Sequence, residues 1–251
     1  MTYEIHITHR CNFKCPACCA LCNVVNDITS DMDMNEVEEV VRQINDVDRG
    51  SKGIRVIGGE PTLHPQCYEI CRYIKNNITN IAWLSLATNH TNNTLADKIK
   101  NDLSFGVQVD DRSVDPATVA RNRAKKHWSF LISPKEEGLP IGDPYQCYAL
   151  TSKCGFAVHK WRGKLAWSWC GNGAAVAKLL RREDMLAPTL YELLGSGFGK
   201  WARIVCENCS CIAYTKFLAC EYPDLISPCF VDGLRELREY NEKLHSDNYA
   251  K

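Results

Sequence analysis

Short apolar runs alternate with amphipathic stretches along the first half of the chain, and this rhythm predicts strands and helices in turn. Residues 3–8 alternate between apolar and polar side chains, which is typical of a strand with two different faces. Further strands are predicted at residues 54–57, 81–87, 105–109 and 127–132. Apolar residues three or four apart predict helices over residues 31–44, 65–78, 93–99 and 116–126.

Strands that alternate with helices at this spacing predict a parallel α/β sheet, because each helix carries the chain back to start the next strand. The carboxyl ends of parallel strands meet at one edge, where such folds place their ligands. Polar residues follow the predicted strands at this edge: cysteines after the first, then Glu60, Asn89, Asp110 and Ser133. The sequence therefore predicts a ligand site there.

The pattern changes after Pro134. Glycines and prolines between residues 138 and 144 predict a linker. Beyond it, residues 156–167 predict a β-hairpin that turns near Arg162 and Gly163. Short helices are predicted at residues 179–182 and 189–194.

Composition narrows the class of protein. The chain has 251 residues with 15 cysteines, and Lys plus Arg equals Asp plus Glu at 30 each. Zero net charge gives no electrostatic footprint for duplex nucleic acid. The sequence shows no signal-peptide pattern, and no apolar run is long enough to span a membrane. An odd number of cysteines without a signal peptide predicts a reduced, cytoplasmic metalloprotein rather than a disulfide-linked one.

Three cysteines, Cys11, Cys15 and Cys18, lie on one predicted loop after the first strand, with the spacing C-x₃-C-x₂-C. Three thiolates on a compact loop can hold three irons of a [4Fe–4S] cluster and leave the fourth iron open to another ligand. The alternative is structural Zn²⁺, which needs a fourth ligand. The candidates for that ligand are Cys19, Cys22 and His9.

A second motif, Gly58-Gly59-Glu60-Pro61, follows the apolar run at residues 54–57. Glycines directly after a strand let the backbone approach a ligand closely. A cysteine triad about forty residues before a strand that ends in this motif resembles the radical S-adenosylmethionine (SAM) superfamily. The resemblance implies a partial (β/α)₆ barrel of the TIM type, a [4Fe–4S] cluster on the three cysteines, and SAM bound to the open iron.

The same resemblance implies which residues contact SAM, with the backbone of the glycine motif meeting the methionine amino group. The expected SAM-binding residues are Phe13, Gly58, Gly59, Glu60, Pro61, Thr88, Asn89, Gln108 and Ser133. The last four have an alternative role as strand-end caps or turn residues. No residue stands out as the catalytic acid or base.

Four further residues of reactive type are not assigned to the site. His64 and His90 follow strand ends, where a lone loop histidine is usually solvated. Cys67 and Cys71 lie one helical turn apart and are predicted to be buried, inert thiols.

The second half contains eight of the cysteines. A cysteine, a hairpin, a second cysteine, a helical stretch and a C-x₂-C pair resemble the twitch domain, a shortened SPASM domain that holds an auxiliary [4Fe–4S] cluster. The resemblance implies a radical SAM barrel over residues 1–140 and a twitch-like domain over residues 141–251. Cys147 could replace one of the four ligands, and structural zinc is an alternative. The implied ligands are Cys154, Cys170, Cys206 and Cys209.

Together these resemblances imply a radical SAM oxidoreductase. The expected substrate is a small polar molecule such as a sugar or an aminocyclitol, with the auxiliary cluster as electron acceptor. An external one-electron reductant of the flavodoxin or ferredoxin type would start the reaction. The alternatives are maturation of ribosomal peptides and a zinc-stabilised binding module without catalysis.

Overall fold

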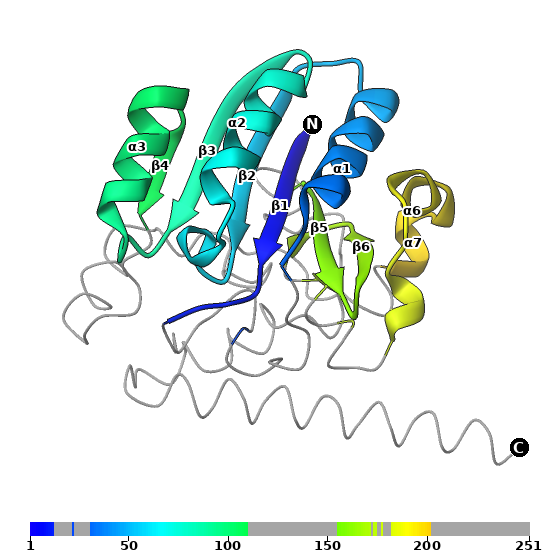
Figure 1. Cartoon of the computed structure of the whole chain (residues 1–251). Coiled ribbons are helices and arrows are strands. Elements are labelled where there is room, and N and C mark those ends of the chain that lie inside the picture. Colours follow the sequence, from blue (N-terminus) through cyan, green and yellow to red (C-terminus); the bar gives the residue numbers. More distant parts are fainter. Residues whose placement is uncertain are drawn as a thin grey trace, which may run out of the picture.

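The computed structural model describes residues 1–12, 22, 31–109, 155–171, 173–174, 177 and 182–201. Within them, six strands form one sheet in the order β4-β3-β2-β1-β5-β6. The helices α1, α2 and α3 lie side by side over one face of this sheet (Figure 1). The predicted helix at 116–126, strand at 127–132 and linker at 138–144 fall outside the described residues.

The elements follow the predicted order. The strands are β1 (Thr2–Thr8), β2 (Lys52–Gly58), β3 (Ile81–Thr88), β4 (Gly106–Val109), β5 (Phe156–Trp161) and β6 (Lys164–Ser168). The helices are α1 (Met34–Val47), α2 (Cys67–Asn77), α3 (Asn93–Leu103), α6 (Leu190–Ser196) and α7 (Phe198–Trp201), with 3₁₀ turns η2 (Pro61–Leu63) and η5 (Glu183–Met185). Strands β1 to β4 are all paired in parallel, so the predicted parallel α/β sheet is confirmed. A closed or partial barrel stays a prediction.

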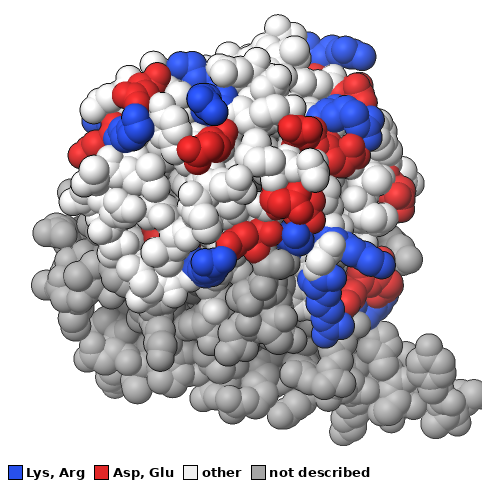
Figure 2. Space-filling model, in the orientation of Figure 1, with Lys and Arg blue, Asp and Glu red and all other residues white. Residues whose placement is uncertain are grey.

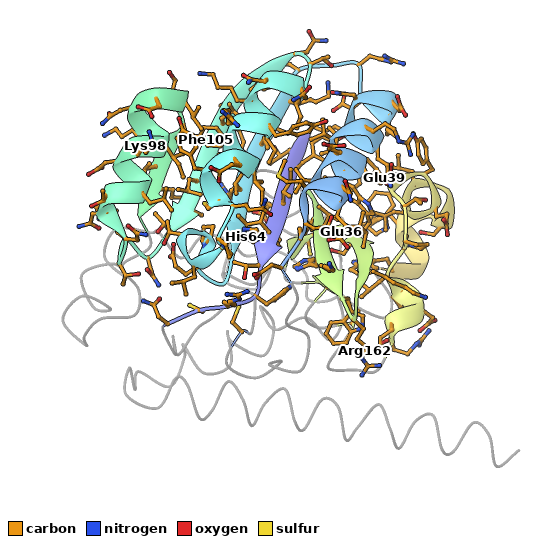
Figure 3. All side chains as sticks on the ribbon, in the orientation of Figure 1. Glu36, Glu39, His64, Lys98, Phe105 and Arg162 are labelled. Carbon is orange, nitrogen blue, oxygen red and sulfur yellow. The ribbon has the colours of Figure 1, made fainter. Side chains whose placement is uncertain are left out.

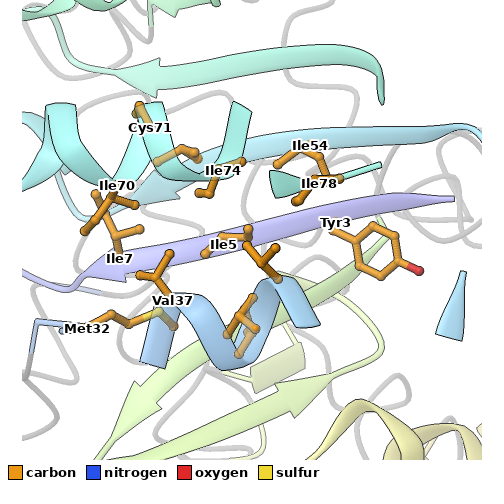
Figure 4. Close-up of a cluster of buried hydrophobic side chains, with 14 of the residues drawn as sticks. Tyr3, Ile5, Ile7, Met32, Val37, Ile54, Ile70, Cys71, Ile74 and Ile78 are labelled. Atoms are coloured by element: carbon orange, nitrogen blue, oxygen red, sulfur yellow. The ribbon is translucent and has the colours of Figure 1, made fainter. Parts of the chain in front are cut away.

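Strand β1 has two different faces, as its alternating pattern predicted. Tyr3, Ile5 and Ile7 are completely buried and pack with α1 and α2, as Figure 4 shows for the apolar core between sheet and helices. The opposite face carries Glu4 and His6, which are also buried. Burying polar groups is costly unless they find partners, so this second face must be a network of polar contacts.

Helix α1 begins where its sequence provides a cap. The Asp33 carboxylate accepts a hydrogen bond from the Glu36 amide at 3.0 Å, and the Glu36 carboxylate accepts one from the Asp33 amide at 2.9 Å. This capping box satisfies two amide groups that a helix start would otherwise leave unpaired. The predicted apolar face of the helix is buried, at Val37, Val40, Val41 and Ile44.

The predicted hairpin is present, with its turn at Arg162 and Gly163, both at positive φ. The hairpin is joined to the main sheet. β5 pairs in parallel with β1, so the hairpin extends the sheet that begins at the N-terminus. Gly155 allows this approach, because a side chain there would overlap the carbonyl oxygen of Thr2. The boundary near residue 140 itself stays a prediction.

Polar contacts attach the later segments to α1. The Lys160 ammonium of β5 lies 2.8 Å from the carboxylate of Glu36, which Figure 3 labels on the part of α1 nearest the hairpin. At the other end of the helix, the buried amide oxygen of Gln43 accepts a hydrogen bond from the Leu190 amide of α6 at 2.7 Å. Helix α1 therefore contacts β5 near its first turn and α6 near its last turn.

The surface carries both signs of charge. Lys and Arg side chains are interspersed with Asp and Glu on the face shown in Figure 2. This mixture agrees with the balanced composition of the chain. Among the described residues, none of the helices has the length and apolar character needed to cross a membrane.

Candidate functional site

The carboxyl ends of β1, β2 and β3 meet at one edge of the sheet. Cys11 lies three residues beyond β1, the motif Gly58–Pro61 spans the end of β2, and Asn89 follows β3. The structure thus brings together Cys11 and six of the predicted SAM-binding residues. These are Gly58, Gly59, Glu60, Pro61, Thr88 and Asn89. Gln108 lies on β4 and is exposed.

Several predicted site residues cannot be placed and keep their roles as predictions. They fall outside the described residues, and they are Phe13, Cys15, Cys18, Ser133, Cys154, Cys206 and Cys209.

The two glycines of the motif make room for protein backbone. A side chain on Gly58 would overlap the carbonyl oxygen of Thr8, and one on Gly59 would overlap that of Arg10. The Gly59 amide donates to the Thr8 carbonyl at 2.9 Å, and the Glu60 amide donates to the Arg10 carbonyl at 2.7 Å. The glycines were expected to let a ligand approach. In the structure they let the end of β2 brace the residues that lead directly into Cys11.

The Glu60 carboxylate is completely buried and acts as a four-bond latch between β2 and β3. One oxygen accepts hydrogen bonds from the Thr62 amide at 3.0 Å, the Thr62 hydroxyl at 2.6 Å and the Thr88 hydroxyl at 2.7 Å. The other accepts from the Asn89 amide at 2.6 Å. The side chains of Glu60 and Thr88 are therefore hydrogen-bonded to each other. The contact of these two residues with SAM stays a prediction.

A second set of bonds closes the segment that contains the cysteine triad. Asp31 accepts a hydrogen bond from the Thr8 hydroxyl at 2.7 Å and forms an ion pair with Arg10. The Met32 amide donates to the Ile7 carbonyl at 2.9 Å. Residues 10 and 31, on either side of the segment, are thus held together at the sheet edge. Sequence reasoning missed Asp31, since its partners lie more than twenty residues away.

Asn12 and Asn89 connect the first residues after β1 to the end of β3. The Asn89 side-chain amide donates to Asn12 at 2.8 Å, and the Asn12 amide donates to the Thr91 hydroxyl at 3.0 Å. Asn89 in turn accepts from the Thr91 amide at 3.1 Å. Asn89 was predicted as a site residue, whereas Asn12 and Thr91 were not.

The polar face of β1 contains a cluster that sequence reasoning overlooked. His6, His9 and His159, here called the histidine stack, are at most 5% exposed. The rings of His6 and His159 lie 3.8 Å apart between centroids, and His159 Nδ1 lies 3.2 Å from His9 Nε2. His9 had been considered only as a possible zinc ligand. Its neighbour comes from β5, 150 residues later, which no local pattern reveals.

Glu4, which lies on the same face of β1 as His6, forms an ion pair with Arg55. The Glu4 carboxylate accepts a hydrogen bond from the Arg55 guanidinium of β2 at 2.7 Å. Burial by itself raises the pKa of Glu4, but His6 and Arg55 outweigh it and hold this pKa below its ordinary value. Glu4 is therefore a buried carboxylate stabilised in its charged form.

His64, Cys67 and Cys71, which were not assigned to the site, have structural roles. His64 was expected to be solvated, and this is wrong: it is 3% exposed, its Nε2 donates to the Met32 carbonyl at 2.9 Å, and its Nδ1 accepts from the Gln66 amide at 3.0 Å. Cys67 and Cys71 are buried, as predicted. The neighbouring thiol of Cys67, and then burial, raise the pKa of Cys71, which keeps it protonated and unreactive.

Cys170, predicted as a ligand of the auxiliary cluster, is buried just beyond β6. Its sulfur accepts a hydrogen bond from the Gly173 amide at 3.2 Å, and its carbonyl accepts one from the Ser168 hydroxyl at 2.8 Å.

Of the predicted cluster ligands at the sheet edge, the structure describes Cys11, which is partly exposed. Among the described residues, no three Cys, His, Asp or Glu side chains converge on one point as metal ligands. The residues that are described still fit a cluster here, because Cys11 offers a sulfur donor on backbone fixed from two sides.

The described residues define a parallel α/β protein in which hydrogen bonds from the end of β2 brace the residues between β1 and Cys11. The sequence profile of the radical SAM superfamily matches residues 5–134, more than half of the chain, and the chain belongs to this superfamily. Membership implies a [4Fe–4S] cluster, SAM, and cleavage of SAM to a radical.

A curated relative is the GTP 3′,8-cyclase of Microcystis aeruginosa (strain NIES-843 / IAM M-2473), which is 28% identical over 131 residues. That similarity covers 50% of this chain and 39% of the relative's own length. The chain therefore matches well under half of that protein.

Proposed function

We propose that this chain is a radical SAM oxidoreductase that oxidises a small polar substrate of the sugar or aminocyclitol type, with an auxiliary [4Fe–4S] cluster as electron acceptor. Cys11, Cys15 and Cys18 would hold the first cluster, and Cys154, Cys170, Cys206 and Cys209 the second. When bound, the first cluster and SAM supply a 5′-deoxyadenosyl radical, and an external one-electron reductant of the flavodoxin or ferredoxin type provides the electron.

The proposed oxidation removes the equivalent of two hydrogen atoms from an alcohol group of the substrate. An alcohol carbon loses one hydrogen atom to the radical, and the remaining carbon radical then loses one proton and one electron to become a ketone. The protein has to hold that carbon close to the radical and keep water away.

The observation that carries the proposal is the bracing of the chain before Cys11. Two backbone hydrogen bonds from Gly59 and Glu60 fix residues 8–10, and the latch at Glu60 fixes β2 to β3. Groups around metal ligands that fix their orientation support both affinity and reactivity. This chain thus supplies a preorganised start for its cysteine segment.

The buried thiol of Cys170 supports the second cluster. Its sulfur already accepts an amide hydrogen bond, and hydrogen bonds to sulfur are one of the factors that set iron–sulfur potentials. Maturation of a ribosomal peptide remains an alternative that shares the same cofactors.

A second candidate function is radical chemistry on a purine nucleotide. The similarity to a GTP 3′,8-cyclase favours it, although that similarity is confined to about half of this chain. Similarity over about half of the chain supports shared SAM chemistry and leaves the substrate open.

Anaerobic reconstitution of the full chain with iron and sulfide tests the proposal. About seven to eight irons per chain are expected for two cubic clusters, and about four for the first cluster alone. Reductant and SAM should release 5′-deoxyadenosine, and Cys15→Ala should abolish this release. Cys67→Ala is the matched control, because Cys67 is a buried thiol on α2 that is not one of the proposed cluster ligands.

Two outcomes would count against the proposal. A colourless protein that binds zinc and releases no 5′-deoxyadenosine refutes the radical function. Consumption of GTP, but of no sugar or aminocyclitol, would replace the first candidate by the second.

A further inference from the structure

The histidine stack links strands that are distant in sequence. His6 and His9 come from β1 and the residue after it, and His159 comes from β5. The three ring centroids are separated by 3.8 Å for His6–His159, 5.3 Å for His9–His159 and 6.2 Å for His6–His9. Since His159 Nδ1 and His9 Nε2 are 3.2 Å apart, one ring nitrogen donates its hydrogen to the other.

Backbone that carries a predicted metal ligand lies at each end of the stack. His9 precedes Cys11 by two residues. At the other end, Gly171 follows Cys170, and a side chain on Gly171 would come within 2.5 Å of the Glu4 carboxylate and 3.4 Å of His6 Nε2. The stack therefore lies between the residues that lead into Cys11 and the backbone at Gly171.

We infer that His159 is a positioning residue for the cluster on Cys11, acting through His9. The backbone bonds from Gly59 and Glu60 hold residues 8–10 from the side of β2. His159 holds the His9 side chain from the opposite side, that of β5. Together these contacts fix the approach to Cys11 from both neighbouring strands.

This role follows from burial as well as from distance. His9 is 5% exposed and His159 is 1% exposed, so water cannot readily replace the contact between them. Replacing a group that orients a metal ligand typically lowers metal affinity or activity by about 10- to 100-fold. The inference rests on the proposed function only in that Cys11 is taken as a metal ligand.

Two substitutions separate the hydrogen bond from the ring stacking. His159→Phe retains a flat ring against His6 but removes the nitrogen that faces His9. His159→Asn loses the ring but places an amide near the position of Nδ1. On the other side of the contact, His9→Gln places an amide near Nε2, whereas His9→Leu removes it.

Gln43→Leu is the matched control. It removes a buried hydrogen bond between α1 and α6 that spans 147 residues of sequence, comparable to the 150 spanned by the His9–His159 contact. It leaves β1 and Cys11 untouched. Any general loss of stability from breaking such a contact will be seen in this variant too.

The parent chain and each full-length variant are reconstituted anaerobically. They are compared by the rate of metal loss to a chelator and by the electron paramagnetic resonance spectrum of the reduced cluster with and without SAM. His159→Phe and His9→Leu should lose metal about 10- to 100-fold faster and change the SAM-dependent spectrum. His159→Asn and His9→Gln should stay within about twofold of the parent chain because they retain a polar partner in the contact. Gln43→Leu should stay within about twofold because the hydrogen bond that it removes lies between α1 and α6.

The inference is overturned if His159→Phe matches the parent chain, or if His159→Asn is as impaired as His159→Phe. Circular dichroism confirms that each variant is folded before the comparison. Failure of the proposed function is recognised separately, because the parent chain would then release no 5′-deoxyadenosine. Metal loss from the Cys11 segment can be measured whichever metal it holds.

Discussion

The latch at Glu60 gives a quantitative prediction for the protein without its cofactors. In Glu60→Gln, one end of the side chain can still accept the three hydrogen bonds made by Thr62 and Thr88. The other end becomes an NH₂ group that faces the donating amide of Asn89, so that bond is lost. A hydrogen bond to a charged group contributes about 1.5–3 kcal/mol, and the Asn89 amide, which is only partly buried, adds a smaller cost when it loses its acceptor.

We therefore expect Glu60→Gln to lower the free energy of unfolding by about 2–4 kcal/mol, a large fraction of the 5–15 kcal/mol typical of a domain. Glu60→Ala leaves all four donors without this acceptor and should be worse. Denaturant unfolding of the cofactor-free chain, followed by circular dichroism, measures the change. Glu38→Gln, on the exposed face of α1, should stay within about 0.5 kcal/mol. An unchanged unfolding midpoint for Glu60→Gln would falsify the claim that the hydrogen bonds of Glu60 stabilise the fold.

Three further predictions concern other described residues. The ammonium group of the fully buried Lys52 lies 2.9 and 3.3 Å from two carbonyl oxygens, so Lys52→Met should lower the free energy of unfolding by about 1–3 kcal/mol in a urea titration. Gly59→Ala should lower the free energy of unfolding by about 1–3 kcal/mol in the same titration, because the added methyl group would overlap the Arg10 carbonyl oxygen. A methyl group on Gly195 of α6 meets no atom within 4 Å, so Gly195→Ala should leave the stability unchanged or raise it. Because the folded-state pKa of Glu4 is lowered, Glu4 adds to the free energy of unfolding above its unfolded pKa of about 4.3, and this stabilisation is lost as pH falls through the folded value. Arg55→Met removes one of the groups that lower this pKa, so the variant should lose less stability on acidification than the parent chain. An equal loss of stability in the two chains would contradict this prediction.

Local patterns predicted much of the fold for a clear reason. The capping box at Asp33 and the apolar spacing of Val37 to Ile44 are properties of neighbouring residues, and both determine α1 directly. The hairpin was predictable in the same way, since Arg162 and Gly163 separate two strand-like runs. Element ends were less accurate: α3 continues to Leu103, beyond the predicted end at residue 99.

Tertiary contacts account for what the sequence did not reveal. No local feature of residues 156–161 indicates that they pair with β1. His64 was expected in solvent, but its environment depends on the carbonyl of Met32, 32 residues earlier. The motif at Gly58–Pro61 was correctly placed at the sheet edge, yet its contacts with residues 8–10 and the four bonds of Glu60 depend on three strands coming together.

The pairing of β5 with β1 also affects how the protein is made. Synthesis proceeds from the N-terminus at about 5–20 residues per second, so β1 emerges roughly 8–30 s before the partner that lies 150 residues later. During this interval the edge of β1 that pairs with β5 has no partner, and unpaired strand edges promote aggregation of nascent chains. Recombinant production should therefore benefit from chaperone co-expression, whereas slower translation would lengthen the interval and increase aggregation.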